Sequence, residues 1–294
     1  MKKWIGISLL FVLFACNSEE SKTTETPVVQ EKDKTSEKII PSDVELGTYS
    51  FVEIGVKGTY EVSRKFYQTI GFQEIPSQFE DTTLVMMSDN SLKIVLNKAS
   101  IAPAMLVYLN PNLEQLKVKL KEQGILFSQP GEDFIEIKSP NGAHIAIIDM
   151  DPTGKFEIKH PNMMEMMQTN DIGNPAALPN PKIGIFGEFS HQVRDVEEAM
   201  KWWAKVGLMG SGIMEFGYKF AILMDKCSVV GVHEKQDTKW IGSAITYFAT
   251  DQEVRIEQLK KELDPEMIRE SQQLGQGSAI VKSPEGNLIF VFKL

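Results

Sequence analysis

The sequence predicts an α+β protein with two tandem copies of one domain. Within each domain, a strand followed by a helix and further strands occurs twice. Two observations predict this fold. Three separate segments of the chain recur in the same order further on, and within each copy the spacing of apolar residues alternates between the strand and the helix period. The chain has 294 residues, 42% of them hydrophobic, which is enough for two domains that each bury a core.

The internal repeat fixes the domain boundaries. Three pairs of segments match: "KFYQTIGF" (65–72) with "KWWAKVGL" (201–208), "LEQLKVKL" (113–120) with "IEQLKKEL" (256–263), and "KSPNGAHIAII" (138–148) with "KSPEGNLIFVF" (282–292). The offsets between partners are 136, 143 and 144 residues, so only small loop changes separate the copies. We therefore place the first domain at 48–150, the second at 182–294, and a linker rich in Pro and Asn at its end at 151–181.

The elements of the first domain follow from its periodicity. "SFVEIGV" (50–56) alternates as a strand. The next segment places Val62, Phe66 and Ile70 four residues apart on one helical stripe, and Gly71 ends the helix. The remaining pattern predicts two strands joined by a Ser-Asp-Asn-Ser turn, a third strand, a helix and a strand pair, at 82–88, 91–98, 104–110, 111–124, 134–139 and 143–149.

The N-terminus has the pattern of an export signal. Lys2 and Lys3 precede an uncharged run that is too short for a permanent membrane span and ends at Cys16, so 1–15 is predicted to be a signal peptide. "LFAC" resembles a bacterial lipobox, which predicts lipidation of Cys16 and attachment to membrane lipid through its acyl chains. An ordinary secretory signal with a chance cysteine is the alternative.

The segment 16–47 is polar and charged and has no aromatic residue, so it is predicted to be a disordered tether. The expected location is the bacterial cell envelope, on the periplasmic face or at the cell surface. Loss of Lys2 and Lys3 takes the formal charge from −9 to about −11, and an acidic body of this kind argues against nucleic acid as a partner. Cys227 is then the one remaining thiol besides the lipidated Cys16, so no intramolecular disulfide is available.

The helix ends and the "S-P-x-G" hairpins resemble those of the glyoxalase/bleomycin-resistance/extradiol-dioxygenase (vicinal oxygen chelate) superfamily, over nearly all of both domains. This resemblance implies paired βαβββ modules whose sheets curl into a cup around a metal. It also implies a metal ligand on the first strand of a domain, about fourteen residues before the aromatic pair of the helix. Glu188 occupies that position in the second domain, and Glu53 takes the same place in the first if one loop residue is deleted.

The other ligand positions that the resemblance implies are not filled by ligands. The last-strand position falls at Ala146 and Phe290, and the fifth-strand position at Ala104 and roughly Ser243. A catalytic divalent site needs about three converging protein ligands. We therefore expect no conventional metal site and no cofactor, while a divalent metal held by atypical ligands stays open.

Two carboxylate–imidazole pairs are candidates for a polar site. His144 lies two residues before Ala146, on the same face of a strand, where it could meet Glu53 as a general base. In the second domain Glu188 could meet His233 and bind a ligand. Polar residues that only line a wet cleft are the plain alternative. His160 and His191 are expected to be structural or exposed.

Three functional classes remain open. The first is a small-molecule-binding protein without a metal. The second is an enzyme, either a lyase or dioxygenase with atypical metal ligands or a metal-free acid–base catalyst. The third is a structural surface lipoprotein. The methionine cluster "MMEMM" (163–167) is expected to seal a domain interface rather than bind a ligand.

Overall fold

The structure is a computed structural model that describes residues 39–40, 42–77, 79, 83–100, 104–129, 131–154, 171–210, 212–215, 217–235, 243–270 and 275–294. All of them belong to Ile39–Leu294, which forms one compact unit distinct from Met1–Lys38. The predicted signal peptide with Cys16, the methionine cluster and His160 lie outside the described residues. Within the described ranges, no helix is long and apolar enough to cross a membrane.

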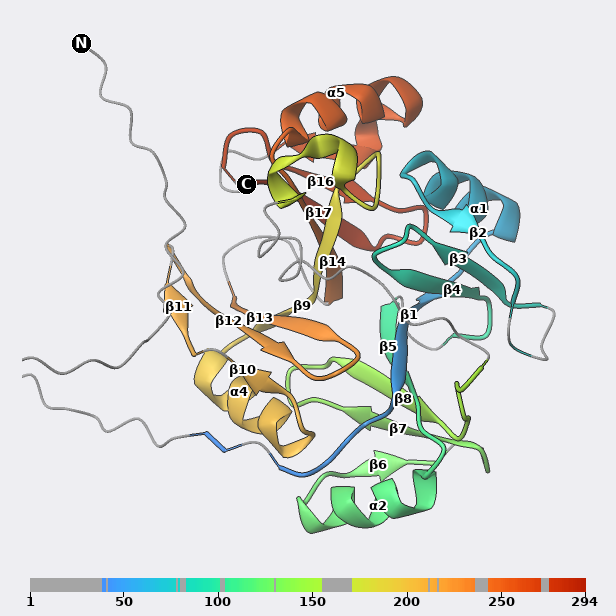
Figure 1. The fold of residues 1–294 in the computed structure, drawn as a ribbon, viewed down its shortest axis with the longest axis vertical. Coiled ribbons are helices and arrows are strands. Elements are labelled where there is room, and N and C mark those ends of the chain that lie inside the picture. Colours follow the sequence, from blue (N-terminus) through green and yellow to red (C-terminus); the bar gives the residue numbers. More distant parts are fainter. Residues whose placement is uncertain are drawn as a thin grey trace, which may run out of the picture. The chain divides into compact units, whose positions relative to one another are not determined.

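The described chain forms two sheets, one for each predicted domain (Figure 1). The first sheet has the strand order β2-β3-β4-β1-β5-β8-β7-β6. Its domain comprises β1 (Tyr49–Gly55), α1 (Tyr60–Thr69), β2 (Gln73–Glu74), β3 (Val85–Ser88), β4 (Lys93–Asn97), β5 (Ala104–Leu109), α2 (Leu113–Glu122), β6 (Phe127–Ser128), β7 (Phe134–Lys138) and β8 (His144–Ile148).

The second sheet has the order β10-β12-β13-β9-β14-β17-β16-β15, with β11 paired to β12. Its domain comprises β9 (Ile185–Val193), α4 (Val196–Lys205), β10 (Met209–Gly210), β11 (Met214–Glu215), β12 (Lys219–Met224), β13 (Val229–Glu234), β14 (Ser243–Ala249), α5 (Gln252–Glu262), β15 (Ile268–Glu270), β16 (Ala279–Lys282) and β17 (Leu288–Lys293). Short 3₁₀ helices lie at η1 (Asp171–Gly173), η2 (Pro175–Ala177) and η3 (Pro265–Met267).

The two sheets have the same connectivity. In the first, β1 pairs in parallel with β4 and antiparallel with β5, and in the second β9 pairs in the same way with β13 and β14. The α+β prediction and its repeated strand–helix–strands pattern are confirmed. The two-residue strands β2 and β6 escape sequence analysis because they are too short to show a period.

The stripe predicted for α1 is partly wrong. Val62 is 53% exposed, whereas Ser63, Phe66, Tyr67 and Ile70 are buried. The buried positions recur at three- and four-residue steps from Ser63, so the true stripe starts with a small polar residue that a hydrophobicity pattern does not mark.

The predicted tether ends earlier than expected. Val44 and Leu46 are buried, and the backbone N–H of Ser42 donates to the carbonyl of Ala204 at 2.9 Å. The last part of the predicted tether, 39–47, therefore packs against the folded domains. Alternating apolar residues in this stretch supply burial that the polar residues before it cannot provide.

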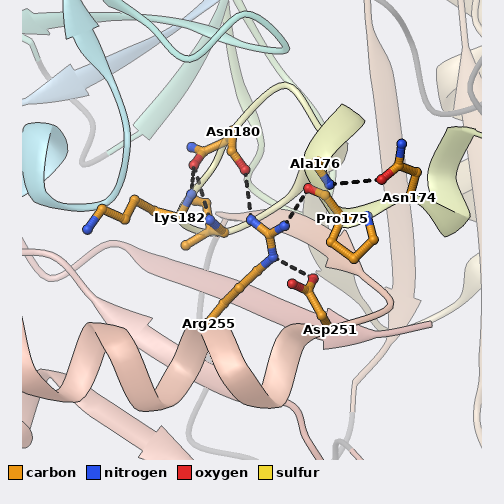
Figure 2. Close-up of polar contacts among 8 residues, drawn as sticks. Asn174, Pro175, Ala176, Asn180, Lys182, Asp251 and Arg255 are labelled. Atoms are coloured by element: carbon orange, nitrogen blue, oxygen red, sulfur yellow. Dashed lines mark hydrogen bonds and ion pairs between the residues drawn. The ribbon is translucent and has the colours of Figure 1, made fainter.

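The end of the predicted linker is also part of the fold. Arg255 of α5 is 4% exposed. Its guanidinium donates to Asp251 Oδ1 at 2.6 Å and to the carbonyls of Asn180 and Pro175 at 3.1 and 2.9 Å (Figure 2). The Asn180 amide oxygen accepts two backbone N–H groups, and its Nδ2 donates to the Ile70 carbonyl at the end of α1. A fully paired, buried Asn thus joins the linker to the first domain.

Candidate functional site

The candidate site lies on the face of the second sheet that points away from the helices. On β9, Phe189 and His191 face the helices, where the His191 ring stacks on Trp203 at 5.9 Å between centroids. Because side chains alternate along a strand, Glu188 and Ser190 face the other way. Both are buried, and both belong to a polar cluster in the middle of the sheet.

Glu188 and His233 form a direct hydrogen bond in this cluster. His233 on β13 places its Nε2 at 2.6 Å from Glu188 Oε1, and the Ser190 hydroxyl donates to the same oxygen at 2.7 Å. The Ser190 and Thr246 hydroxyls lie 2.6 Å apart. The two residues expected to meet in the second domain therefore do meet, within a network of four polar side chains.

The environment favours the ionised form of Glu188. Burial by itself opposes ionisation and would raise the pKa of this carboxyl. The charge that His233 carries when protonated and its hydrogen bond act in the opposite direction, and the hydroxyls of Ser190 and Thr246 add to them. These favourable contacts prevail, so the pKa of Glu188 is lowered and the carboxylate is charged at neutral pH.

Two glycines make room for this arrangement. A Cβ on Gly231 of β13 would lie 2.3 Å from the Glu188 carboxyl carbon, so the carboxylate occupies the space above that glycine. Gly187 sits at a register shift between β9 and β14, and a Cβ there would lie 2.3 Å from the Phe248 ring. A bulge of this kind re-aims the side chains that follow it, here Glu188.

Tyr218 completes the polar cluster on the far side of His233. Its hydroxyl lies 3.3 Å from His233 Nδ1, the nitrogen that does not face Glu188. The His233 ring stacks parallel to that of Phe220, with an interplanar angle of 4°. Burial raises the pKa of Tyr218, and the charge of Glu188 adds to this, so the phenol keeps its proton at neutral pH.

Apolar and aromatic residues share this face of the sheet. Phe290 lies level with Thr246 across the β14–β17 pairing, and the Phe290 and Phe292 rings stack at 5.9 Å. Several apolar side chains of this face stay partly exposed: Phe220, Ile222, Met224, Phe248 and Phe292. The buried polar cluster is thus bordered by apolar surface that the described part of the chain does not fully cover.

The first domain has a different arrangement. Glu53 accepts a hydrogen bond from Asn97 Nδ2 at 3.1 Å, and the structure does not bring it to His144. Strand β5 separates β1 from β8, so their backbones lie roughly 10 Å apart. The pKa of His144 is lowered by partial burial and, to a smaller extent, by Lys138. The Glu53–His144 pair expected from the sequence does not form.

The same face of the first sheet is mostly filled by apolar side chains. They form a separate buried cluster of Tyr49, Phe51, Met86, Val95, Met105, Val107, Leu109 and Ala146. Phe79 packs on it, with its ring 5.5 Å from that of Phe51. A polar ligand site is therefore favoured in the second domain and not in the first.

The sheet register corrects the equivalence of the two glutamates. Glu53 lies opposite Val95 of β4, and in the second sheet Ser190 lies opposite Gly231, which is the residue equivalent to Val95. The structural counterpart of Glu53 is therefore Ser190, not Glu188. The reason is the connection to the helix. Ser190 lies 12 residues before Trp202, whereas Glu53 lies 13 residues before Phe66, so this connection is one residue shorter in the second domain, and counting back from the helix cannot reveal that.

The donor set around Glu188 does not fit a conventional catalytic metal site. Three adjacent strands place a carboxylate, a hydroxyl and a phenyl ring side by side in one row across the sheet, from Glu188, Thr246 and Phe290. Glu188 and His233 are the two strong ligands, and they bond to each other directly. Within the described residues, no group of three or more His, Cys, Asp and Glu could hold a metal ion.

Two further residues of the sequence analysis lie on the helix side. Ser243 lies opposite His191 and its hydroxyl is 2.9 Å from His191 Nδ1, so it does not face Glu188. His191 is 3% exposed, which agrees with a structural role, one of the two expectations for this residue.

Cys227 is a half-buried thiol, and burial raises its pKa to about 12.

Three residues of the polar cluster were not predicted from the sequence: Ser190, Thr246 and Tyr218. Ser190 has a signal, since it lies two residues after Glu188 and therefore on the same face. Thr246 has none without the register of β14, and Tyr218 precedes β12 by one residue in a stretch without periodicity.

No protein-family model matches the sequence, and no curated protein matches it. Solved structures do match the fold. An extradiol ring-cleaving dioxygenase from Brevibacterium fuscum has a TM-score of 0.53 at 13% identity, with 87% of this chain and 74% of that chain covered. The E323L mutant of homoprotocatechuate 2,3-dioxygenase from the same organism has a TM-score of 0.51 at 13% identity, with coverages of 87% and 73%.

At this level of identity the likeness concerns the fold. It agrees with the two sheets and with the motifs that repeat between them. The chain therefore shares its fold with these extradiol dioxygenases, with two tandem domains, each built from paired βαβββ modules, as the resemblance noted in the sequence implied.

Proposed function

We propose that the chain is a lipid-anchored protein of the bacterial cell envelope that binds a small molecule on the second sheet, at Glu188 and His233. The hydrogen bond between these two side chains carries the proposal. A buried carboxylate on an apolar face is costly unless it is paired, and such groups cluster at functional sites. Here the pair is bordered by partly exposed aromatic rings, a common composition for ligand sites.

The two domains offer a matched comparison. Glu188 faces a polar cluster, whereas Glu53 faces Asn97 beside a filled apolar cluster. If the second domain binds the ligand, a change at Glu188 should abolish binding and the same change at Glu53 should not.

Native mass spectrometry tests this comparison. The chain from residue 17 onward, which contains the whole compact unit, would be incubated with a small-molecule extract of the bacterial envelope. We expect a bound species of low mass on the wild type and on Glu53→Gln, and its loss on Glu188→Gln and His233→Gln. Absence of any bound species, or loss in Glu53→Gln alone, would contradict the proposal.

The anchor is a separate proposal with its own test. The basic start, the short apolar run and Cys16 in a lipobox-like context support lipidation. Cys16→Ser should leave an unlipidated precursor that no longer partitions into the detergent phase. Unchanged partitioning and an unchanged mass would show that Cys16 carries no lipid.

An enzyme is the second candidate, and two observations favour it. The two solved structures described above are dioxygenases, which supports an enzyme of that type, with atypical metal ligands, at the level of fold. The other observation is the pair itself, since a carboxylate that orients an imidazole can serve metal-free proton transfer, with His233 Nδ1 accepting the proton. Hydrogen–deuterium exchange into the bound species in D₂O, abolished by His233→Gln, would distinguish catalysis of this kind from binding.

A further inference from the structure

The polar cluster has a direction that follows from its hydrogen bonds. An ionised Glu188 can only accept, so the proton in its bond to His233 lies on Nε2. In the neutral imidazole the other nitrogen then has no proton and acts as an acceptor. The Tyr218 hydroxyl lies 3.3 Å from this nitrogen, so it donates to a neutral His233.

The series of hydrogen bonds therefore starts at Tyr218, which donates to His233, and His233 in turn donates to Glu188. With its proton directed to His233, the phenol oxygen has its lone pairs left for a further partner. That oxygen can accept a hydrogen bond but not donate one. Glu188 also makes the cluster negative, which disfavours an anion close by.

We propose that Tyr218 contacts the ligand and presents an acceptor, so that the site selects an apolar or aromatic molecule carrying a hydroxyl or amine and rejects a carboxylate or phosphate. The aromatic body of such a ligand would lie on the partly exposed rings of Phe220 and Phe248. This inference rests on the proposed function, because it assumes that the second sheet binds a ligand at all.

Four probes of similar shape test the polarity of the site. Benzyl alcohol and benzylamine carry donors, benzoate carries an anionic acceptor and toluene carries neither. Each would be titrated against the chain from residue 17 onward at mildly alkaline pH, with dissociation constants from protein NMR. We expect both donor probes to bind about tenfold or more tightly than benzoate.

Substitutions assign this preference to Tyr218. Tyr218→Phe should weaken the two donor probes about five- to tenfold and leave toluene unchanged, because only the acceptor oxygen is removed. Tyr60→Phe is the matched control, since Tyr60 accepts a hydrogen bond from the Lys98 backbone in the first domain and should not affect any probe.

The outcomes separate the two proposals. Probes that bind beside Glu188 with no effect of Tyr218→Phe, or benzoate as the tightest probe, would overturn the role of Tyr218 and leave the binding site in place. Absence of any probe from the surroundings of Glu188 would overturn both. If Tyr218→Phe does not fold, imidazole ¹⁵N NMR of the wild type decides: a proton on His233 Nε2 supports the proposal, and one on Nδ1 overturns it.

Discussion

His191 and His233 lie on opposite faces of the same sheet and have different roles. His233 bonds to a buried carboxylate, whereas His191 lies against Trp203 and Phe189 with Ser243 as its polar contact. Burial lowers the pKa of His191 to about 3, and the nearby charge of His233 contributes less. A buried neutral imidazole of this kind stabilises the fold only while it stays neutral.

The pH dependence of stability should reveal His191. In the unfolded chain it titrates near its ordinary pKa of 6.5, so between about 3 and 6.5 the unfolded state binds a proton that the folded state does not. The free energy of unfolding is therefore highest above this range and should fall by about 1.4 kcal/mol per unit as the pH drops through it. Glu188 lowers the free energy of unfolding further only when the pH falls below the ordinary pKa of a glutamate, 4.5, because its own pKa in the folded state is lowered.

Urea unfolding from about pH 7 to about pH 5 measures this slope. His191→Gln should flatten it, while His144→Gln should keep most of it because His144 is far less buried. An unchanged slope in His191→Gln would assign the acid sensitivity to other groups.

At the level of the elements, two glycines shape the site. Gly187 is the extra residue of a bulge in β9, directly before Glu188, which lies level with Thr246, and Gly231 leaves the space that the carboxylate fills. The family resemblance implied that Glu188 lies at a ligand position on the first strand, but a bulge depends on pairing between distant strands. For the same reason the sequence suggested a Glu53–His144 pair, whereas β5 holds the two residues apart.

Gly231→Ala tests the fit between these two strands. The added methyl group would lie 2.3 Å from the Glu188 carboxyl, which must move and lose its bond to His233. We expect a loss of about 1–3 kcal/mol in the free energy of unfolding, together with a changed His233 imidazole signal in ¹⁵N NMR. Gly58→Ala is the control, because no atom lies within 4 Å of its added Cβ, and an equal loss there would show that the clash with Glu188 is not the cause.

At the scale of the whole compact unit, two of the hydrogen bonds between the domains are equivalent to each other. Asp89, in the β3–β4 turn of the first domain, accepts from the Tyr247 hydroxyl of β14 at 2.5 Å. Asp225, in the equivalent turn of the second domain, accepts from the Tyr108 hydroxyl of β5 at 2.7 Å. Each aspartate also accepts backbone N–H groups of its own turn, so the turns and the domain contact stabilise each other.

The internal repeat predicted two copies of one domain, but not this exchange between them. A repeat identifies equivalent residues and contains no information on which copy they contact. The packing of 39–47 and of the linker end at Asn180 was not predicted either, because polar linker composition does not show that a segment has a buried partner.

Removing either hydroxyl should weaken the whole unit. Tyr108→Phe and Tyr247→Phe should each lower the free energy of unfolding by about 1–3 kcal/mol, because each leaves a carboxylate with one donor fewer, partly buried at Asp225 and fully buried at Asp89. Both variants should still unfold in one transition by calorimetry, and Tyr60→Phe should cost less than about 1 kcal/mol. Two separate transitions would show that the domains are independent.

The central claim is that Glu188 and His233 form a polar binding pair rather than part of a metal centre. Calorimetric titration of the chain from residue 17 onward with zinc, nickel, manganese and iron(II) tests it most directly, on the wild type, Glu188→Gln and Glu53→Gln. A carboxylate and an imidazole that already bond to each other should bind these ions weakly, so we expect no tight stoichiometric binding that depends on Glu188. Tight binding of one ion per chain, lost in Glu188→Gln and kept in Glu53→Gln, would contradict the claim and establish a metal centre with atypical ligands.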